Sequence, residues 1–538
     1  MEGCFRLGYR IGETYLRARG LSPTAGNPAL RRESVVVAPD RSTVTISASL
    51  PNGGSLRTQD SRPVNGFEYS LDGGTTWSRL GITATITAPG TVTLALDSGP
   101  WPVGARFAYL RGGPSPWTPA LPAVTASVQA DLLCGGRPGS GHGIVGNGWY
   151  FRDLAEVKMW PQSARLIQQP TVFERWRTQH PESPSAQMFW WWNLPSYADL
   201  SVTPRPTYWS DGRKGPDIHS NPPALRQRLR QRYGEFPLFN FWGPGADITS
   251  TRWIVDATLD VLKEERPGLC LCYLPHLDYD LQRFGPDSAQ ASKAAAAVDA
   301  EAARLLDFAA AEDLELSVIS EYGIEAVSQA VFPNRILREA GLLAIHPAQN
   351  GSILDPGNSR AFAVCDHQCA HVYVANPRDL ATVTELLAAS PGIETVYQPE
   401  QLESIGLNHP RSGELFCVAK PGWWLAYPYW LESDAEPDFA RCVDIHKKPG
   451  YDPCELFIDP ALALPKVRIG MKLLAKKLGM RTLMNFIPTD TGLVKGSHGR
   501  LPSSPELGPV FIAAEGCPLS CTFAAATPSD RGRKNVAR

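Results

Sequence analysis

The chain contains 538 residues, of which 43% are hydrophobic and 20% charged, and its 52 Lys and Arg against 54 Asp and Glu leave a net charge of −2. A chain of this length is expected to form two or three domains, because a typical domain spans ~100–200 residues. The composition is that of a globular protein with a sizeable core, and the balanced charge gives no sign of a nucleic-acid partner.

The N-terminal stretch, Met1 to Gly20, lacks the uninterrupted apolar run of a secretory signal. No segment approaches the ~18 consecutive apolar residues of a membrane span. We therefore expect a cytoplasmic protein without a membrane partner. The 11 cysteines are an odd, scattered number, which favours free thiols in a reducing compartment. Cys517 and Cys521, in a tail at 510–538 whose end is expected to be disordered, are interpreted as loose thiols, with a local pair or half a metal site as the alternative.

The N-terminal part of the chain predicts a module separate from the rest. Residues 1–35 show no periodicity and are expected to be irregular. Residues 36–112 carry short β-branched runs separated by Gly-rich turns, which is typical of a small antiparallel β-sandwich. The segment Phe67 to Trp77 is similar to hairpins of bacterial immunoglobulin-like or fibronectin-like modules. A linker, Arg111 to Pro122, leads into the core at 113–509.

The core predicts an α/β fold. Two apolar runs, Leu269 to Pro275 and Leu314 to Ser320, are predicted strands, and the Ala-rich segment Ser292 to Leu314 is a predicted helix. Strand, helix and strand in this order predict a right-handed parallel crossover, and open α/β sheets bind ligands where their strands end. A further predicted strand, Ala370 to Val374, belongs either to a cap within 325–440 or to the margin of the sheet.

Four short segments carry most of the functional information. They are LPAVTASVQ (Leu121 to Gln129), YLPHLDYDLQRFGP (Tyr273 to Pro286), VISEYGI (Val318 to Ile324) and KGSHG (Lys495 to Gly499). In this order they resemble the nucleophile and metal-ligand motifs of the type I phosphodiesterase/nucleotide pyrophosphatase family of the alkaline phosphatase superfamily, over about residues 121–509. The resemblance implies an alkaline-phosphatase-like, mostly parallel sheet flanked by helices. It also implies metal-dependent hydrolysis of phosphodiester or pyrophosphate bonds in a small phosphorylated substrate, with a nucleotide among the candidates.

In that family a Thr or Ser attacks phosphorus while two metal ions, usually zinc, activate it. Such help is needed because a free hydroxyl is a poor nucleophile at neutral pH. By resemblance, Thr125 takes the nucleophile position, and Asp278 and His498 match two metal ligands. Thr125 could also cap a helix beginning near Ser127, a role compatible with attack because the helix N-terminus is positive.

Two ligand positions depart from the family pattern. Gln282 stands where the resemblance predicts His, and Glu321 and Tyr322 stand where it predicts Asp and His. Glu321 is the expected third metal ligand, beside Asp278 and His498, and Gln282 and Tyr322 are expected to orient the substrate. This oxygen-rich set suits manganese, magnesium or calcium better than a zinc pair, and a single ion is an alternative to two.

The beginning of the core departs further. Val128 occupies the position of an oxyanion-steadying Asn, which leaves Gln129 as the nearest amide. The family's first strand and its Asp ligand are not found upstream of Thr125, and Asp40, the only stand-in, is more typical of a turn. A missing strand and ligand keep an alternative open, namely a catalytically impaired pseudoenzyme or a phosphate-ligand-binding protein of the same fold.

Other polar clusters have two interpretations each. Asp366 and His367, with His371, supply either extra ligands and substrate contacts or, twice as often for such a pattern, a polar loop. Asp444 and His446 lie in a Gly- and Pro-rich turn. This turn either binds a phosphate or sugar of the substrate or is a hydrogen-bonded structural loop.

Three aromatic or imidazole features stay open as well. His276 is a candidate for contacting and orienting Asp278, because residues two apart in an extended chain point to the same side. The tryptophans at 190–192 and 423–424 favour core packing, with a nucleobase platform as the alternative.

Overall fold

The computed structural model of the chain describes residues 31–37, 40, 43–49, 67–70, 82–88, 91–96, 106–109, 115–116, 119–210, 213–432, 434–504 and 507–512. Of the segment expected to be irregular, 1–35, the first thirty residues lie outside the described ones, as do the tail beyond 512 and Cys517 and Cys521. Its last five residues are not irregular, because they begin strand β1 (Arg31–Val37). The chain divides into two compact units. The first comprises Met1–Trp117, Ala295–Ile319 and Val510–Arg538, and the second Thr118–Ala294 and Ser320–Pro509. Among the described helices, none is long and apolar enough to cross a membrane.

The β-branched runs of the N-terminal module form strands, as the sequence predicts. Four strands pair antiparallel in the order β1-β2-β5-β4, and β3 pairs antiparallel with β6. They are β1 (Arg31–Val37), β2 (Thr43–Ser49), β3 (Phe67–Ser70), β4 (Ile82–Ala88), β5 (Thr91–Leu96) and β6 (Arg106–Tyr109). Their packing as a sandwich stays a prediction. Asp40 lies in an exposed turn between β1 and β2, in agreement with the turn interpretation.

The expected parallel crossover is wrong in its pairing. The run Leu314 to Ser320 forms only the short strand β16 (Val318–Ile319), which pairs antiparallel with β26 (Val510–Ile512). The other run forms β15 (Leu269–Cys272), which pairs with β10 instead. Leu314 is 40% exposed, whereas a strand inside a parallel sheet is covered on both faces. The apolar residues of this run therefore do not form a central strand of a parallel sheet.

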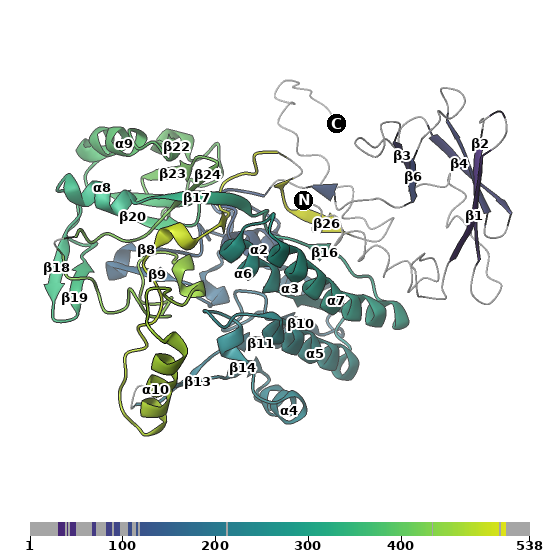
Figure 1. Ribbon diagram of the computed structural model, residues 1–538, viewed down its shortest axis with the longest axis horizontal. Helices are drawn as coiled ribbons and strands as arrows, with labels where there is room; N and C mark the ends of the chain where they lie inside the picture. Colours follow the sequence, from purple (N-terminus) through teal and green to yellow (C-terminus); the bar gives the residue numbers. More distant parts are fainter. Residues whose placement is uncertain are drawn as a thin grey trace. The chain divides into compact units, whose positions relative to one another are not determined.

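A mostly parallel sheet forms part of the second unit and is flanked by helices (Figure 1). Its order is β14-β11-β10-β15, where β10 runs parallel to β11 and β15, and β14 is antiparallel to β11. The strands are β10 (Ser185–Met188), β11 (Leu200–Pro204), β14 (Ile218–Asn221) and β15, and the flanking helices are α4 (Pro223–Tyr233) and α5 (Ile248–Glu265). Helix α7 (Ala289–Ala311) forms at the predicted position. Leu229 and Trp253 share one buried cluster with Met188 and Val202. The predicted α/β class is confirmed.

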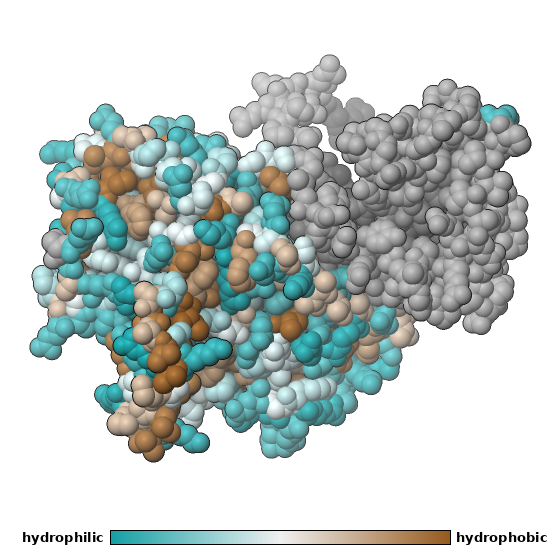
Figure 2. Space-filling view, in the orientation of Figure 1, coloured by the Kyte–Doolittle hydropathy of each residue, from teal (hydrophilic) through white to brown (hydrophobic). Residues whose placement is uncertain are grey.

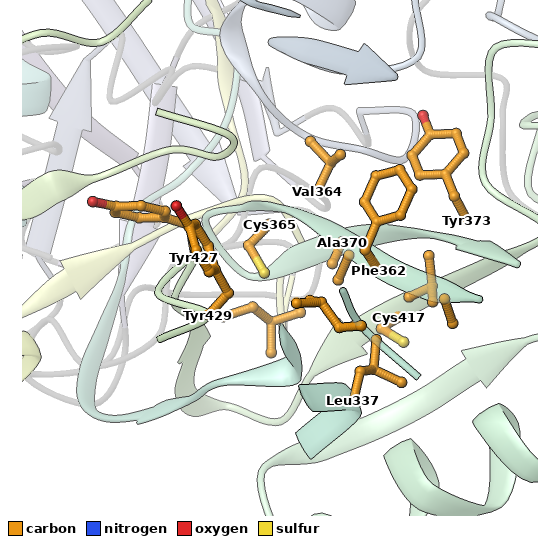
Figure 3. Close-up of a cluster of buried hydrophobic side chains, with 14 of the residues drawn as sticks. Leu337, Phe362, Val364, Cys365, Ala370, Tyr373, Cys417, Tyr427 and Tyr429 are labelled. Carbon is orange, nitrogen blue, oxygen red and sulfur yellow. The ribbon is translucent and has the colours of Figure 1, made fainter. Parts of the chain in front are cut away.

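A second, antiparallel sheet has the order β20-β21-β23-β22 and contains the predicted strand at 370–374. Its elements are β20 (Ala361–Asp366), β21 (Cys369–Val374), β22 (Ile393–Tyr397) and β23 (Leu415–Ala419), with α8 (Pro333–Glu339) and α9 (Leu380–Ala388). Figure 3 shows its apolar face, where Leu337 of α8 and Phe362, Ala370 and Cys417 of three strands belong to one buried cluster. Every residue of β20 and β21 is buried, so these two strands are covered on both faces.

Strand β17 (Glu325–Val331) brings two of the four motifs together. It pairs antiparallel with β25 (Gly496–Ser497), so that Glu325 lies opposite Ser497, and parallel with β24 (Gly422–Leu425). The Glu321-Tyr322 motif immediately precedes β17, and His498 immediately follows β25. Segments separated by some 170 residues therefore meet at one end of β17.

Candidate active site

Thr125 is the first residue of helix α2 (Thr125–Cys134), and Val124 is the N-cap. The helix thus begins two residues earlier than predicted, and Thr125 does not cap it. The Thr125 side chain instead lies in the protein interior, where its Oγ1 is 2.8 Å from the hydroxyl of Tyr322. At this position the hydroxyl is beside the positive end of the helix dipole, which favours negative charge developing on or near it.

The start of α2 is held by contacts from distant parts of the chain. The amide of Ala126 donates to Oδ1 of Asn147 at 2.8 Å, and the indole of Trp192 donates to the Ala126 carbonyl at 2.8 Å. Asn147 is fully buried and was not singled out from the sequence. Only its position in the GHGIVGN stretch, near the nucleophile motif, could have drawn attention to it. These contacts fix the backbone that carries Thr125.

Asp278 and Gln282 lie one turn apart on helix α6 (His276–Phe284) and bond to each other. The amide of Gln282 donates to Oδ2 of Asp278 at 2.6 Å, and its carbonyl oxygen accepts from the hydroxyl of Tyr451 at 2.8 Å. The hydroxyl of Tyr322 is 3.4 Å from Oδ1 of Asp278. Gln282 therefore orients Asp278 and leaves its own amide oxygen committed to Tyr451.

The premise that pointed to His276 is wrong, because this segment is helical and not extended. His276 begins α6, and residues two apart on a helix lie on different faces. Its ring instead packs edge-on against Tyr279, with ring centroids 6.3 Å apart. The expected pairing with Asp278 does not follow from this geometry.

Gln129 is committed to other groups. Its amide donates to Oε1 of Glu321, and its carbonyl oxygen accepts from the amide of Trp191 at 2.5 Å. The indole of Trp191 in turn donates to the Pro161 carbonyl at 2.7 Å. The tryptophans at 190–192 are buried in this packing, which agrees with the core interpretation. Gln129 positions Glu321 and is not free to steady an oxyanion.

Four aromatic rings form a column through the site, in the order Tyr322, His498, His367 and Tyr451, of which the last three are buried and Tyr322 is partly exposed. Tyr322 stacks on His498 with centroids 3.5 Å apart and an interplanar angle of 6°. His498 lies 3.6 Å from His367, and His367 lies 3.6 Å from Tyr451. The column joins the Glu321-Tyr322 motif, the C-terminal motif and the turn between β20 and β21. The sequence gives no periodic signal for such a contact.

His498 presents a buried nitrogen without a partner. Its Nδ1 is 2.8 Å from the carbonyl oxygen of Ala123, which can only accept, so Nδ1 carries the proton and Nε2 carries a lone pair. Nε2 has no hydrogen-bond partner and lies 3.9 Å from Oδ1 of Asp278. Burial lowers the pKa of His498 well below its usual value, so the ring is neutral.

Asp366 and His367 lie next to this group, but Asp366 is fully engaged. Its carboxylate accepts from the backbone and side-chain amides of Asn147 at 2.9 and 3.0 Å, and it is 2.9 Å from Nδ1 of His367. Asp366 therefore fixes Asn147 and the ring of His367. His371 donates from Nε2 to the Val145 carbonyl at 2.8 Å, which agrees with its structural interpretation.

The structure does not bring His446 into contact with this group. Its Nδ1 is 3.2 Å from the carbonyl oxygen of Met159, and its charged neighbours are Lys214, Asp444 and Arg205. A substrate role for His446 stays a prediction without support from the geometry.

Two carboxyl groups of the site have raised pKa values. Burial raises the pKa of Asp278 to about 7 and that of Glu321 to about 8, and the charge of Asp278 contributes to the second shift. Burial also raises the pKa of Tyr322 well above its usual value, so its phenol keeps its proton. A carboxyl group that titrates near neutral pH can exchange protons with a substrate or nucleophile.

The residues present fit one divalent ion better than a pair. Within the described residues, no group of three or more His, Cys, Asp or Glu side chains is placed to hold a metal. The lone pair on Nε2 of His498 and the carboxylate of Asp278 supply two donors that face each other. Neutral imidazole and carboxylate are ordinary metal ligands, and the backbone bond on Nδ1 is the usual way to orient such a histidine. The part of the chain that the structure describes thus places no ligand set for a zinc pair.

An α/β core that places a threonine hydroxyl at a helix N-terminus, beside two carboxylates and a histidine, defines a hydrolase-type site suited to phosphoric esters. The profile described as type I phosphodiesterase / nucleotide pyrophosphatase matches residues 108–452, which is more than half of the chain. The chain belongs to this family. No curated protein shows a significant match.

Several solved structures are similar to the chain at low identity. Phosphonoacetate hydrolase from Sinorhizobium meliloti 1021, in complex with phosphonoformate, is 14% identical with a TM-score of 0.40, over 58% of this chain and 73% of that one. Murine ectonucleotide pyrophosphatase/phosphodiesterase 5 is 15% identical with a TM-score of 0.40, over 60% and 73%. The human protein of that name is 14% identical with a TM-score of 0.41, over 73% and 77%.

Proposed function

We propose that the protein hydrolyses phosphodiester or pyrophosphate bonds of a small phosphorylated substrate, such as a nucleotide, with Thr125 as the nucleophile. The observation that carries this proposal is the position of the Thr125 hydroxyl. It lies at the N-terminus of α2, 2.8 Å from the Tyr322 hydroxyl, which itself is 3.4 Å from Asp278. Family membership over residues 108–452 supports the class of reaction.

The chain's own residues have defined tasks in this proposal. Thr125 attacks phosphorus while the bond from phosphorus to the leaving alkoxide or phosphate oxygen breaks, and water then cleaves the bond between phosphorus and Thr125. Tyr322 holds the attacking oxygen through its hydrogen bond. While no ion is bound, Asp278, whose pKa is raised to about 7, accepts the proton that leaves through the Tyr322 hydroxyl and returns it to the leaving oxygen. The N-terminus of α2 offsets negative charge on the phosphoryl group. Buried tryptophans and Asn147 keep these groups in place.

Asp278 and His498 are the residues that would hold a divalent ion, with Glu321 as a third ligand only if it leaves Gln129. Such an ion, when bound, lowers the pKa of a hydroxyl and neutralises phosphoryl charge. The mixed oxygen and nitrogen donors favour manganese or magnesium, whereas family resemblance favours zinc.

A second candidate function is binding of a phosphorylated ligand without efficient turnover. It is favoured by the way the side chains at the ligand positions satisfy one another. Gln282 bonds Asp278 and Tyr451, Gln129 bonds Glu321, and Tyr322 bonds Thr125. Metal binding to such a site is expected to be weak, because these hydrogen bonds must break before the side chains can coordinate an ion.

A single experiment separates the two functions. Hydrolysis of bis(p-nitrophenyl) phosphate is measured with zinc, manganese and magnesium, and bound metal is determined on the same samples. Thr125→Ala is expected to abolish turnover without loss of metal. Ser127→Ala serves as the matched control, because it removes a buried hydroxyl in the same helical turn that bonds only the carbonyls of Pro122 and Val124. Equal turnover in wild type and Thr125→Ala would refute the nucleophile, and no turnover with any metal would favour the binding protein.

We also propose a cytoplasmic location. All eight cysteines among the described residues are free thiols, which supports a reducing compartment. Cell fractionation with thiol labelling of Cys270 and Cys272, the two that are partly exposed, tests this proposal.

A further inference from the structure

An insertion between Asp459 and Phe486 projects an unpartnered helix from the second unit. The two ends of the insertion are joined by a hydrogen bond of 2.9 Å from the Asp459 amide to the Phe486 carbonyl. Between them lies α10 (Pro465–Lys477), which has no buried residue. A helix of this length gains little stability without a surface to pack on. Its side chains therefore point to a partner that covers it.

One face of this helix is apolar along its whole length. Val467, Met471, Leu474 and Leu478 are 53%, 60%, 57% and 69% exposed. Their spacing of four, three and four residues places them on a single stripe. In Figure 2 this segment, at the bottom of the view, is the brown projection among teal surroundings. A contiguous exposed stripe of large aliphatic side chains marks an interaction site.

The same segment is strongly and uniformly positive. From Pro460 to Asn485 the sequence contains no Asp or Glu, although the whole chain has a net charge of −2. Its six basic residues are Lys466, Arg468, Lys472, Lys476, Lys477 and Arg481. The partner is therefore expected to be both apolar and anionic.

A short hairpin beside the insertion adds exposed aromatic side chains. Nη2 of Arg481 lies 3.4 Å from the carbonyl oxygen of Ser210, in the turn between β12 (Thr207–Tyr208) and β13 (Lys214–Gly215). In this hairpin Tyr208 is 58% exposed and Trp209 is 44% exposed. Tyr and Trp are the residues that proteins place at the boundary between lipid and water.

We propose that α10 and the β12–β13 hairpin form a docking face that binds the surface of a membrane containing anionic lipids. The apolar stripe enters the boundary of the acyl chains, and the basic residues remain among the headgroups. A protein partner would have to offer acidic and apolar groups in register with the helix. An anionic bilayer presents negative headgroups above apolar acyl chains over its whole surface and needs no such register. This proposal revises the expectation of no membrane partner, because a chain without a spanning segment can still bind at the membrane surface.

Flotation of the full chain with vesicles tests this proposal. Vesicles of phosphatidylcholine with phosphatidylserine are compared with vesicles of phosphatidylcholine alone, at low and high salt. Binding is expected to the first kind only and to weaken with salt. Leu474→Ser with Leu478→Ser, and separately Lys476→Glu with Lys477→Glu, are each expected to weaken it by about tenfold or more.

The matched control replaces two exposed leucines elsewhere. Leu154→Ser with Leu314→Ser, at residues 56% and 40% exposed, is expected to bind as wild type. The proposal is overturned if wild type ignores anionic vesicles, or if the control and the α10 variants lose binding equally. Light scattering without lipid adds a further outcome. Self-association that the α10 variants abolish, with no vesicle binding, would assign this face to a second copy of the chain.

Discussion

At the scale of single residues, the Tyr322 phenol is the most unusual group of the site. It touches the Thr125 hydroxyl at 2.8 Å, lies near Asp278 and stacks on His498 with its ring. The family resemblance predicts a histidine at this position. A phenol whose pKa is raised can donate a hydrogen bond but is a poor metal ligand. In the proposed reaction Tyr322 would therefore act on Thr125 directly.

Tyr322→Phe tests that role. The variant keeps the stacked ring but removes the hydroxyl, so turnover is expected to fall by about 10²-fold, within the range for loss of a proton-transfer partner. The thermal midpoint and bound metal should stay the same. Tyr451→Phe, at the other end of the ring column, is the control, because its hydroxyl bonds Gln282 and not Thr125. Equal losses in the two variants would show that the column matters only as packing.

Gln282→His restores the residue that the family resemblance predicts. A histidine one helical turn from Asp278, whose Oδ1 lies 3.9 Å from Nε2 of His498, would supply a third protein ligand. Zinc affinity, measured by calorimetry, is expected to rise by about tenfold or more, the size of effect that ligand changes commonly produce. An unchanged affinity would show that Asp278 and His498 do not form a metal site. Gln227→His, at an exposed position of α4, controls for non-specific zinc binding.

At the scale of elements, close contact between β25 and α6 holds the two ligand motifs together. A Cβ added at Gly496 would lie 2.2 Å from the carbonyl oxygen of Leu281 and 2.9 Å from Cγ2 of Ile324. Backbone atoms cannot yield to such an approach, so β25 would have to move away from the helix that carries Asp278. His498, two residues further along, would move with it.

Gly496→Ala is therefore expected to lower the free energy of unfolding by roughly 1–3 kcal/mol, as overpacking usually does, and to reduce turnover as well. Gly470→Ala is the matched control. Gly470 lies inside α10 with no atom within 4 Å of its added Cβ, so the same change should be neutral or stabilising by about 0.5–1 kcal/mol. Urea unfolding of both variants measures the difference. Wild-type stability in Gly496→Ala would show that the added Cβ does not clash with the Leu281 carbonyl.

Elements also show what the sequence could and could not predict. The helix at 289–311 and the strands β15 and β21 follow from local composition, whereas Thr125, Asp278 and His498 were predicted from the family resemblance. Asn147 and Tyr451 were missed because their importance comes from contacts with residues 219 and 169 positions away. The pairing of β16 was wrong because a short apolar run does not reveal its partner.

At the scale of the whole molecule, stability depends on pH through buried histidines that the fold keeps neutral. His371 donates from Nε2 to the Val145 carbonyl at 2.8 Å and accepts on Nδ1 from the Gly413 amide at 3.2 Å. A proton on Nδ1 would face that amide. Burial lowers the pKa of His371 from 6.5 to about 4, and the bond to Val145 only partly opposes this shift.

The direction of the pH effect depends on the pH at which His371 binds its proton in the folded protein and in the unfolded chain. Between about pH 6.5 and 4 the unfolded chain protonates His371 and the folded protein does not, so the free energy of unfolding falls as the solution is acidified through this window. The loss from this residue is at most about 3 kcal/mol. His371→Gln removes the titrating group, so unfolding by urea at pH 7 and pH 5 should show a smaller decrease in the variant than in wild type. Asp278 and Glu321, whose raised pKa values act in the opposite direction, are present in both proteins and cancel in that comparison. A variant with the full wild-type decrease would mean that His371 already binds its proton in the folded protein, and that its two backbone bonds do not hold the neutral ring.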